Sequence, residues 1–193
     1  MERELKYVDM VEQPISMHPK KFALWLFMVT VVMVFAALTS AYIVRQSEGN
    51  WLEYDLPEIF YFTSGLVVAS SIFLQWGYFS AKKDNLISLR VAISLAVVFG
   101  IAFLVGQWYS WVALVDREVF FVGNPAGSFL YVFTGLHALH LISGVIFLIV
   151  VLISTFKYKV HSQSMNTMEM ATTYWHFLGG LWLYLFMFLL LNH

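Results

Sequence analysis

Five long stretches of the chain contain no Asp, Glu, Lys or Arg, and shorter segments that carry the charged residues separate them. These stretches are residues 22–44, 59–81, 91–115, 119–156 and 170–191. A helix needs about 20 apolar residues to cross a hydrocarbon core ~30 Å thick, so each stretch is long enough to span a membrane. The pattern predicts an all-α membrane protein built as a bundle of five transmembrane helices.

The fourth stretch is too long for one span, and the sequence Gly-Asn-Pro-Ala-Gly at 123–127 is typical of a helix break. We therefore expect the fourth helix to begin near Ser128. Before the first stretch, residues 1–21 are polar and charged. The sequence thus predicts an N-terminal segment 1–21 and a transmembrane domain 22–193.

The basic residues are distributed unevenly between the two sides of this topology. Only Arg45 and Arg117 fall on one side. The other side carries Arg3, Lys6, Lys20, Lys21, Lys82, Lys83, Arg90, Lys157 and Lys159. Because basic residues concentrate in cytoplasmic loops, we expect the N-terminus in the cytoplasm and the C-terminus, at His193, outside.

The composition supports a membrane protein and excludes several other classes. Hydrophobic residues make up 60% of the chain and charged residues 12%, whereas soluble domains carry about 25% charged residues. A formal net charge of -1 gives no basic surplus for binding nucleic acid. The chain has no cysteine, so any metal would have to be held by histidine and carboxylate.

Candidates for proton or ligand binding within the spans are few: His137, His140 and His176, with Glu169 at the inner mouth of the last span. A pump, carrier or channel needs ionisable groups inside the membrane, so their scarcity favours a packing module. No catalytic residue and no metal ligand set is indicated.

Small residues recur at helical spacing in two of the spans. They are Ala92, Ala96 and Gly100 in the third span, and Ala37 and Ala41 in the first. Such stripes let helix backbones approach closely in lipid. We expect both stripes to be helix–helix contacts.

The polar residues of the last two spans allow two interpretations. His137 and His140 are three residues apart and lie on neighbouring rows of one helix face. The last span carries a stripe of Glu169, Thr172, Thr173, His176 and Gly180. These residues could form a ligand or proton site between the two helices. Alternatively, they hydrogen-bond across that interface, each bond contributing about 1 kcal/mol or less.

A bis-histidine haem site is disfavoured by depth. Counted from the inner helix ends, His140 and His176 differ in depth by roughly 15 Å at ~1.5 Å per residue. Two axial ligands of one iron must lie at nearly the same depth.

Several residues of the last two spans form a recognisable combination: the stretch YVFTGLHALHLISG at 131–144, Glu169, the stretch YWHF at 174–177, and Trp182. Together they resemble subunit III of the haem-copper respiratory oxidases. Further similar positions are residues 24–27, Phe35, Tyr42, Arg45, Ser70, Ser71 and 106–109. The resemblance runs from about Phe22 to the C-terminus, and its most specific part is the combination of the two histidine stretches.

The resemblance implies the five-helix form of this family, in the bacterial inner membrane. It also implies a non-catalytic subunit without redox centres, packed against subunit I, which carries the haems and copper, and accompanied by subunit II. The complex would reduce dioxygen to water and pump protons. Whether cytochrome c or a quinol is the electron donor stays open, as does a supercomplex with a quinol-oxidising complex.

The matched residues are the intramembrane polar set His137, His140, Glu169, His176 and Trp182. The chain also departs from the family pattern at three positions. Acidic residues are common in the family where Val31, Ser110 and Gly179 stand here. Any role of those acids in proton or oxygen handling is in doubt for this chain.

Family members hold phospholipids between their helices, which implies a lipid-holding role. Lys157, Lys159 and His161 lie where an inner-leaflet headgroup would need cationic partners. The alternative is that these residues serve only as topology signals.

A function from another class is also compatible with the intramembrane histidines. The chain could be a haem b or quinone-binding membrane anchor of a respiratory dehydrogenase.

Overall fold

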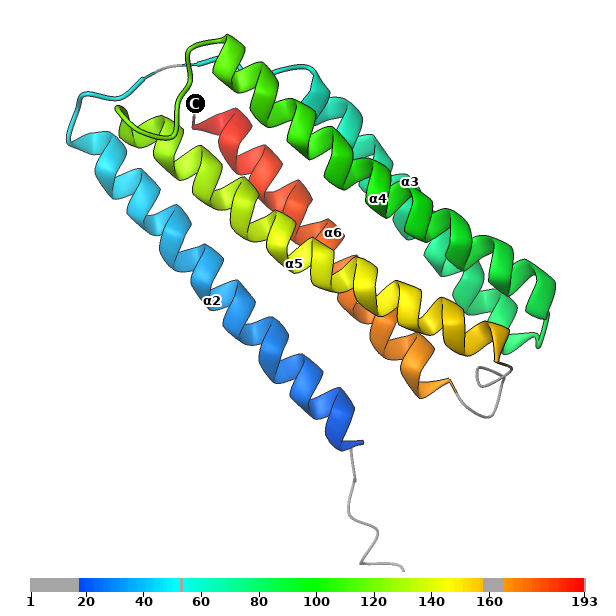
Figure 1. Ribbon diagram of the computed structural model, residues 1–193. Helices are drawn as coiled ribbons and strands as arrows, with labels where there is room; N and C mark the ends of the chain where they lie inside the picture. The colour runs from blue at the N-terminus through cyan, green and yellow to red at the C-terminus, as the bar shows by residue number, and fades with distance from the viewer. Residues whose placement is uncertain (1–17, 53, 158–164, 193) are drawn as a thin grey trace, which may run out of the picture.

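A computed structural model describes residues 18–52, 54–157 and 165–192 of the chain (Figure 1). Its helices are α2 (Pro19–Ser47), α3 (Ile59–Lys82), α4 (Leu86–Asp116), α5 (Pro125–Phe156) and α6 (Asn166–Leu191). Each of these five is long and apolar enough to cross a membrane, and the described ranges contain no strand. The prediction of an all-α bundle of five transmembrane helices is confirmed.

Asparagine side chains set the starts of two helices. The Asn85 side chain accepts a hydrogen bond from the Ser88 amide (3.2 Å) at the start of α4. Asn124 accepts one from the Ala126 amide (2.9 Å) at the start of α5. The expected start near Ser128 is therefore wrong. A proline in the first turn costs no hydrogen bond, because N–H groups there have no partner within the helix, and its φ angle already suits the helix.

The helices are arranged around α5 and α6. The hairpin of α3 and α4 forms one edge, and α2 lies at the opposite edge (Figure 1). The C-terminus lies at the same end of the bundle as the α2–α3 and α4–α5 loops. With five helices in the described residues, the start of α2 and the end of α6 lie at opposite ends of the bundle.

Small residues let the central helices approach closely. Ala92 and Ala96 of α4 are fully buried, and Gly100, on the same stripe, faces the ring of Trp175 from α6. The stripe on α4 is thus a helix–helix contact, as expected. The stripe on α2 is not, because Ala37 and Ala41 are exposed; α2 turns a different face to the bundle.

Helix α2 contacts the bundle along a single stripe. Its buried residues recur every three or four positions and are Met28, Val31, Phe35, Thr39 and Tyr42. Both ends of this stripe are tied to α6 or its cap. Lys21 pairs with Glu169 at one end, and at the other the Tyr42 hydroxyl donates to the carbonyl of Asn192 (2.6 Å). Most of the circumference of α2 is not covered by the other described helices.

Candidate functional site

His137 lies in the core of the bundle. Its side chain is fully buried on α5. The imidazole centroid lies 5.1 Å from that of Trp182 on α6 and 6.1 Å from that of Phe103 on α4. The contacts show a histidine enclosed by aromatic rings from two neighbouring helices.

Trp182 connects α6 to the other side of the core. Its indole Nε1 donates to the Ser64 hydroxyl of α3 over 2.9 Å. The same ring stacks on Phe60 at 6.1 Å, with an interplanar angle of 9°. The indole therefore joins α3, α5 and α6 through one hydrogen bond and its ring contacts.

His140 faces a different neighbour from His137. Its ring centroid lies 6.2 Å from Phe27 and 6.0 Å from Phe35, both on α2. Its Nδ1 lies 2.7 Å from the carbonyl of Leu136 on its own helix. Residues three apart on a helix differ by about 60° in direction, and α5 lies between α2 on one side and α4 on the other. The two histidines therefore belong to separate contacts.

The sequence suggested that the polar stripe of the last helix pairs with α5, but His176 and Glu169 have their partners on other helices. His176 Nε2 lies 3.0 Å from Gln75 Oε1 on α3, and Glu169 forms its ion pair with Lys21 on α2. The physical reason is that α6 packs against α2, α3 and α5 together, so neighbouring positions on it reach different helices. These two side chains are interhelical polar contacts with partners that the sequence stripe did not indicate.

One hydrogen bond that joins α5 and α6 in the described residues involves two side chains outside the expected set. The hydroxyls of Ser143 and Tyr174 lie 2.7 Å apart. Both residues belong to the stretches that carry the family resemblance. The presence of a serine and a tyrosine in these two stretches was the sequence feature that could have indicated this hydrogen bond.

The residues expected to bind lipid at the inner side are only partly described. Lys157 is the exposed cap at the end of α5, whereas Lys159 and His161 lie outside the described residues. The positions where the family commonly carries acids are buried here, with Val31 and Ser110 at 2% and 0% exposure. Gly179 is also buried, and a Cβ there would lie 3.3 Å from the Ser71 hydroxyl.

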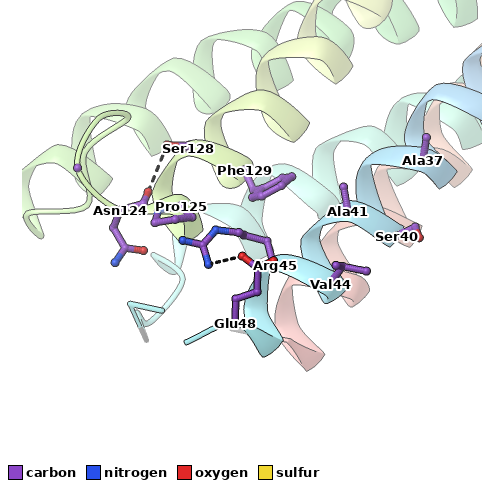
Figure 2. Close-up of a pocket in the computed structure, with 11 residues that line it drawn as sticks. Ala37, Ser40, Ala41, Val44, Arg45, Glu48, Asn124, Pro125, Ser128 and Phe129 are labelled. Carbon is purple, nitrogen blue, oxygen red and sulfur yellow. Dashed lines mark hydrogen bonds and ion pairs between the residues drawn. The ribbon is translucent and has the colours of Figure 1, made fainter. Parts of the chain in front are cut away.

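A groove that the sequence pattern did not indicate lies between α2 and the start of α5. It encloses about 880 Å³ at the end of the bundle that carries the C-terminus, and Figure 2 shows its lining. Ala37, Ala41 and Phe129 form part of its wall. At its rim the Arg45 guanidinium lies 3.0 Å from a Glu48 carboxylate oxygen. The small residues of α2 face this groove and not a helix.

The part of the chain that the structure describes holds no group of three His, Cys, Asp or Glu side chains placed to bind a metal ion. The histidines also contact different helices, since His140 contacts α2 and His176 contacts α3. Their arrangement is one of contacts between helices.

Comparison with known proteins identifies the family of the chain. The family model for cytochrome c oxidase subunit III matches residues 54–192. The probable cytochrome c oxidase subunit 3 of Nocardia farcinica is 32% identical over 165 residues, which cover 80% of this chain and 79% of the relative.

Two further relatives are named cytochrome c oxidase subunit 3. That of Corynebacterium diphtheriae is 29% identical over 168 residues, covering 83% of this chain and 82% of the relative. That of a Synechocystis species is 28% identical over 177 residues, covering 88% and 75%. The matched region includes α3 to α6 and every polar contact between them, and the chain belongs to the cytochrome c oxidase subunit III family of haem-copper oxidases.

Proposed function

We propose that this chain supports, without catalysing, the dioxygen reduction and proton translocation carried out by subunit I of its oxidase, by holding lipid and maintaining proton uptake. The observation that carries the proposal is the placement of its charged groups. The uncharged stretches lie in the middle of the helices, and Glu169, near the start of α6, is paired with Lys21. A helix bundle of this kind offers packing surfaces, whereas a proton path needs a series of ionisable groups inside the membrane.

Membership of the family implies association with other oxidase subunits. We infer that the partners are subunit I, which would carry the haems and copper, and subunit II. The open circumference of α2 supports a role at an interface. Large apolar side chains such as Trp25 and Met33 are 56% and 65% exposed there. Such a surface suits hydrocarbon or another transmembrane helix equally well.

The groove between α2 and α5 supports the lipid-holding part of the proposal. Its wall of Ala37, Ala41 and Phe129 is apolar and suits an acyl chain. Arg45 at the rim is a cation at the level of a headgroup, and a basic contact to an anionic lipid contributes about 1 kcal/mol. Lys157 supplies a second cation at the opposite end of α5. The proposal therefore places lipid contacts in both leaflets.

The test is oxygen consumption against time by the intact oxidase in anionic lipid. A complex that lacks this chain should begin at nearly the full rate and then lose activity faster than wild type, because slower proton uptake leaves the dioxygen site longer in reactive intermediates. Immediate loss of all activity with the haems intact would contradict the supporting role. A haem absorption band stoichiometric with the purified chain alone would also contradict it.

Variants separate the lipid contribution from the rest. Arg45→Gln, and Lys157→Gln combined with Lys159→Gln, should each give a milder form of the same decline. Lys83→Gln, at the exposed residue after α3, is the matched control and should behave as wild type. If all of these variants match wild type, the basic residues are topology signals only.

A further inference from the structure

The buried polar groups without a hydrogen-bond partner in the described residues include two side chains, on α4 and α5, in the core of the bundle. His137 on α5 is fully buried and Gln107 on α4 is 1% exposed. Neither ring nitrogen of His137, and neither amide atom of Gln107, has a hydrogen-bond partner within residues 18–52, 54–157 and 165–192. Unsatisfied polar groups cost several kcal/mol each where no bulk water reaches them.

The helix register places these two residues next to each other. Helices α4 and α5 run antiparallel, and two contacts fix their alignment. Trp111 Nε1 donates to the Thr134 hydroxyl over 2.9 Å, and the rings of Phe103 and His137 lie 6.1 Å apart. Gln107 is one turn from both Trp111 and Phe103, on the same face of α4. It therefore lies between the two contacts, within about one helical turn of the level of His137.

The two side chains lie far from the helix ends, and the neighbouring donor groups already have hydrogen-bond acceptors. His137 is twelve residues into α5, or roughly 18 Å from the helix start at ~1.5 Å per residue, which is beyond the reach of a lipid headgroup. The nearby Thr134 hydroxyl already donates to the carbonyl of Leu130 (2.8 Å). The indole N–H of Trp182 is committed to Ser64. Neither neighbour has a hydrogen left to donate to the pair.

We propose that this core holds a water-binding site in which an ordered water molecule bridges the Gln107 amide and the His137 imidazole. The hydrogen-bonding capacities are complementary. A neutral imidazole has one donor and one acceptor, and an amide has two donors and an acceptor. A water molecule can accept from the amide N–H and donate to the unprotonated ring nitrogen. Buried waters in proteins typically satisfy such groups and are costly to remove.

The bridge ties α4 to α5 in the core, where the Trp182 ring covers the imidazole from α6. It also explains why a glutamine, Gln107, lies within a membrane-spanning helix, which the supporting role in the oxidase does not explain. The inference does not depend on lipid holding or proton uptake. The tests below therefore concern only Gln107 and His137.

The first test is a double-mutant cycle on the full chain in detergent, read as the midpoint of thermal unfolding. Gln107→Met and His137→Phe each leave the other polar group without its bridge, and each should lower the midpoint by several degrees. The double variant replaces both groups by apolar side chains of similar size. It should lose clearly less than the sum of the single losses.

The matched control pairs Gln107→Met with His140→Phe, since His140 faces α2 and not α4. These two losses should add. Additive losses for the Gln107 and His137 pair as well would overturn the proposal.

The second test detects the water itself. In solid-state NMR of the ¹⁵N-histidine-labelled chain in a bilayer, polarisation should pass from water protons to the His137 imidazole. The His137→Phe spectrum assigns the signal, and Gln107→Met should weaken the transfer. Absence of transfer, with a direct coupling between Gln107 and His137, would show a dry hydrogen bond and overturn the water site.

Discussion

The ring of Trp175 on α6 lies directly against Gly100 on α4, so closely that a Cβ on the glycine would lie 2.6 Å from the ring atom Cη2. The same ring contacts α5, where a Cβ on Gly144 would lie 3.3 Å from Cε3. Trp175 is 1% exposed. Three helices meet around one indole because two of them carry no side chain at the point of contact.

We expect Gly100→Ala to destabilise the bundle by about 1–3 kcal/mol, since the added methyl must displace a large buried ring. The measurement is the midpoint of thermal unfolding of the full chain in detergent. Gly135→Ala on α5 is the control, because a Cβ there meets nothing within 4 Å. The control should keep or slightly raise the midpoint, as alanine favours helix over glycine. Equal losses in the two variants would contradict the packing interpretation.

The ion pair between Lys21 and Glu169 should hold the N-terminal end of α2 against α6. Its side chains are 31% and 34% exposed, so we expect Glu169→Gln to weaken this end by no more than about 1 kcal/mol. The reversed pair, Lys21→Glu with Glu169→Lys, should recover part of the loss. The measurement is retention of this chain in the oxidase during detergent washing, compared with Lys83→Gln. Greater loss in the reversed pair than in the single variant would point to a role beyond the ion pair.

His176 should tolerate an amide better than a hydrocarbon side chain. His176→Gln keeps a group that can bond to Gln75, whereas His176→Leu leaves the Gln75 amide without its 3.0 Å partner. We expect the leucine variant to lose about 1 kcal/mol of stability and the glutamine variant less. Gln75→Leu should match His176→Leu in thermal unfolding of the full chain. Equal and complete loss of assembly in both His176 variants would indicate a chemical requirement for imidazole.

The orientation in the membrane can be tested on a background free of native thiols, because the chain has no cysteine. The side chains of Asn85 and Asn124 make helix-capping hydrogen bonds, so the probes belong at nearby exposed residues whose side chains make none, Lys83→Cys and Val122→Cys. The positive-inside rule places residue 83 in the cytoplasm and residue 122 outside. An impermeant thiol reagent added to intact cells should label only Val122→Cys. Labelling of Lys83→Cys alone would reverse the topology.

The helices could be predicted from the sequence because the bilayer imposes a length on every span and forbids unpaired charge within it. The start of α5 was misplaced because Asn124 and Pro125 read as a break, whereas a proline is also a good first helical residue. The stripe of Ala92, Ala96 and Gly100 was correctly expected to be a helix contact.

The partners of the polar residues could not be predicted in the same way. Periodicity shows which residues share a face of a helix, but not which neighbour that face meets. The Gln75 partner of His176 is 101 positions away in the sequence, and Lys21 is 148 positions from Glu169. The Ala37 and Ala41 stripe has the same spacing as the one on α4 yet lines a groove. Distinguishing these cases requires the arrangement of all five helices.

The long separation between α2 and its partners also has a consequence for biosynthesis. At ~5–20 residues per second, the ribosome reaches Glu169 roughly 7–30 s after Lys21. During that interval α2 lacks its ion pair with α6, although it can form side-chain contacts with α5 once that helix is made, among them the ring contacts of Phe27 and Phe35 with His140. The mostly apolar surface of α2, with charges confined to the helix ends, is compatible with contact with lipid before α6 is made. Attachment of α2 is then a late event of assembly, completed when α6 has inserted and Asn192 reaches the hydroxyl of Tyr42.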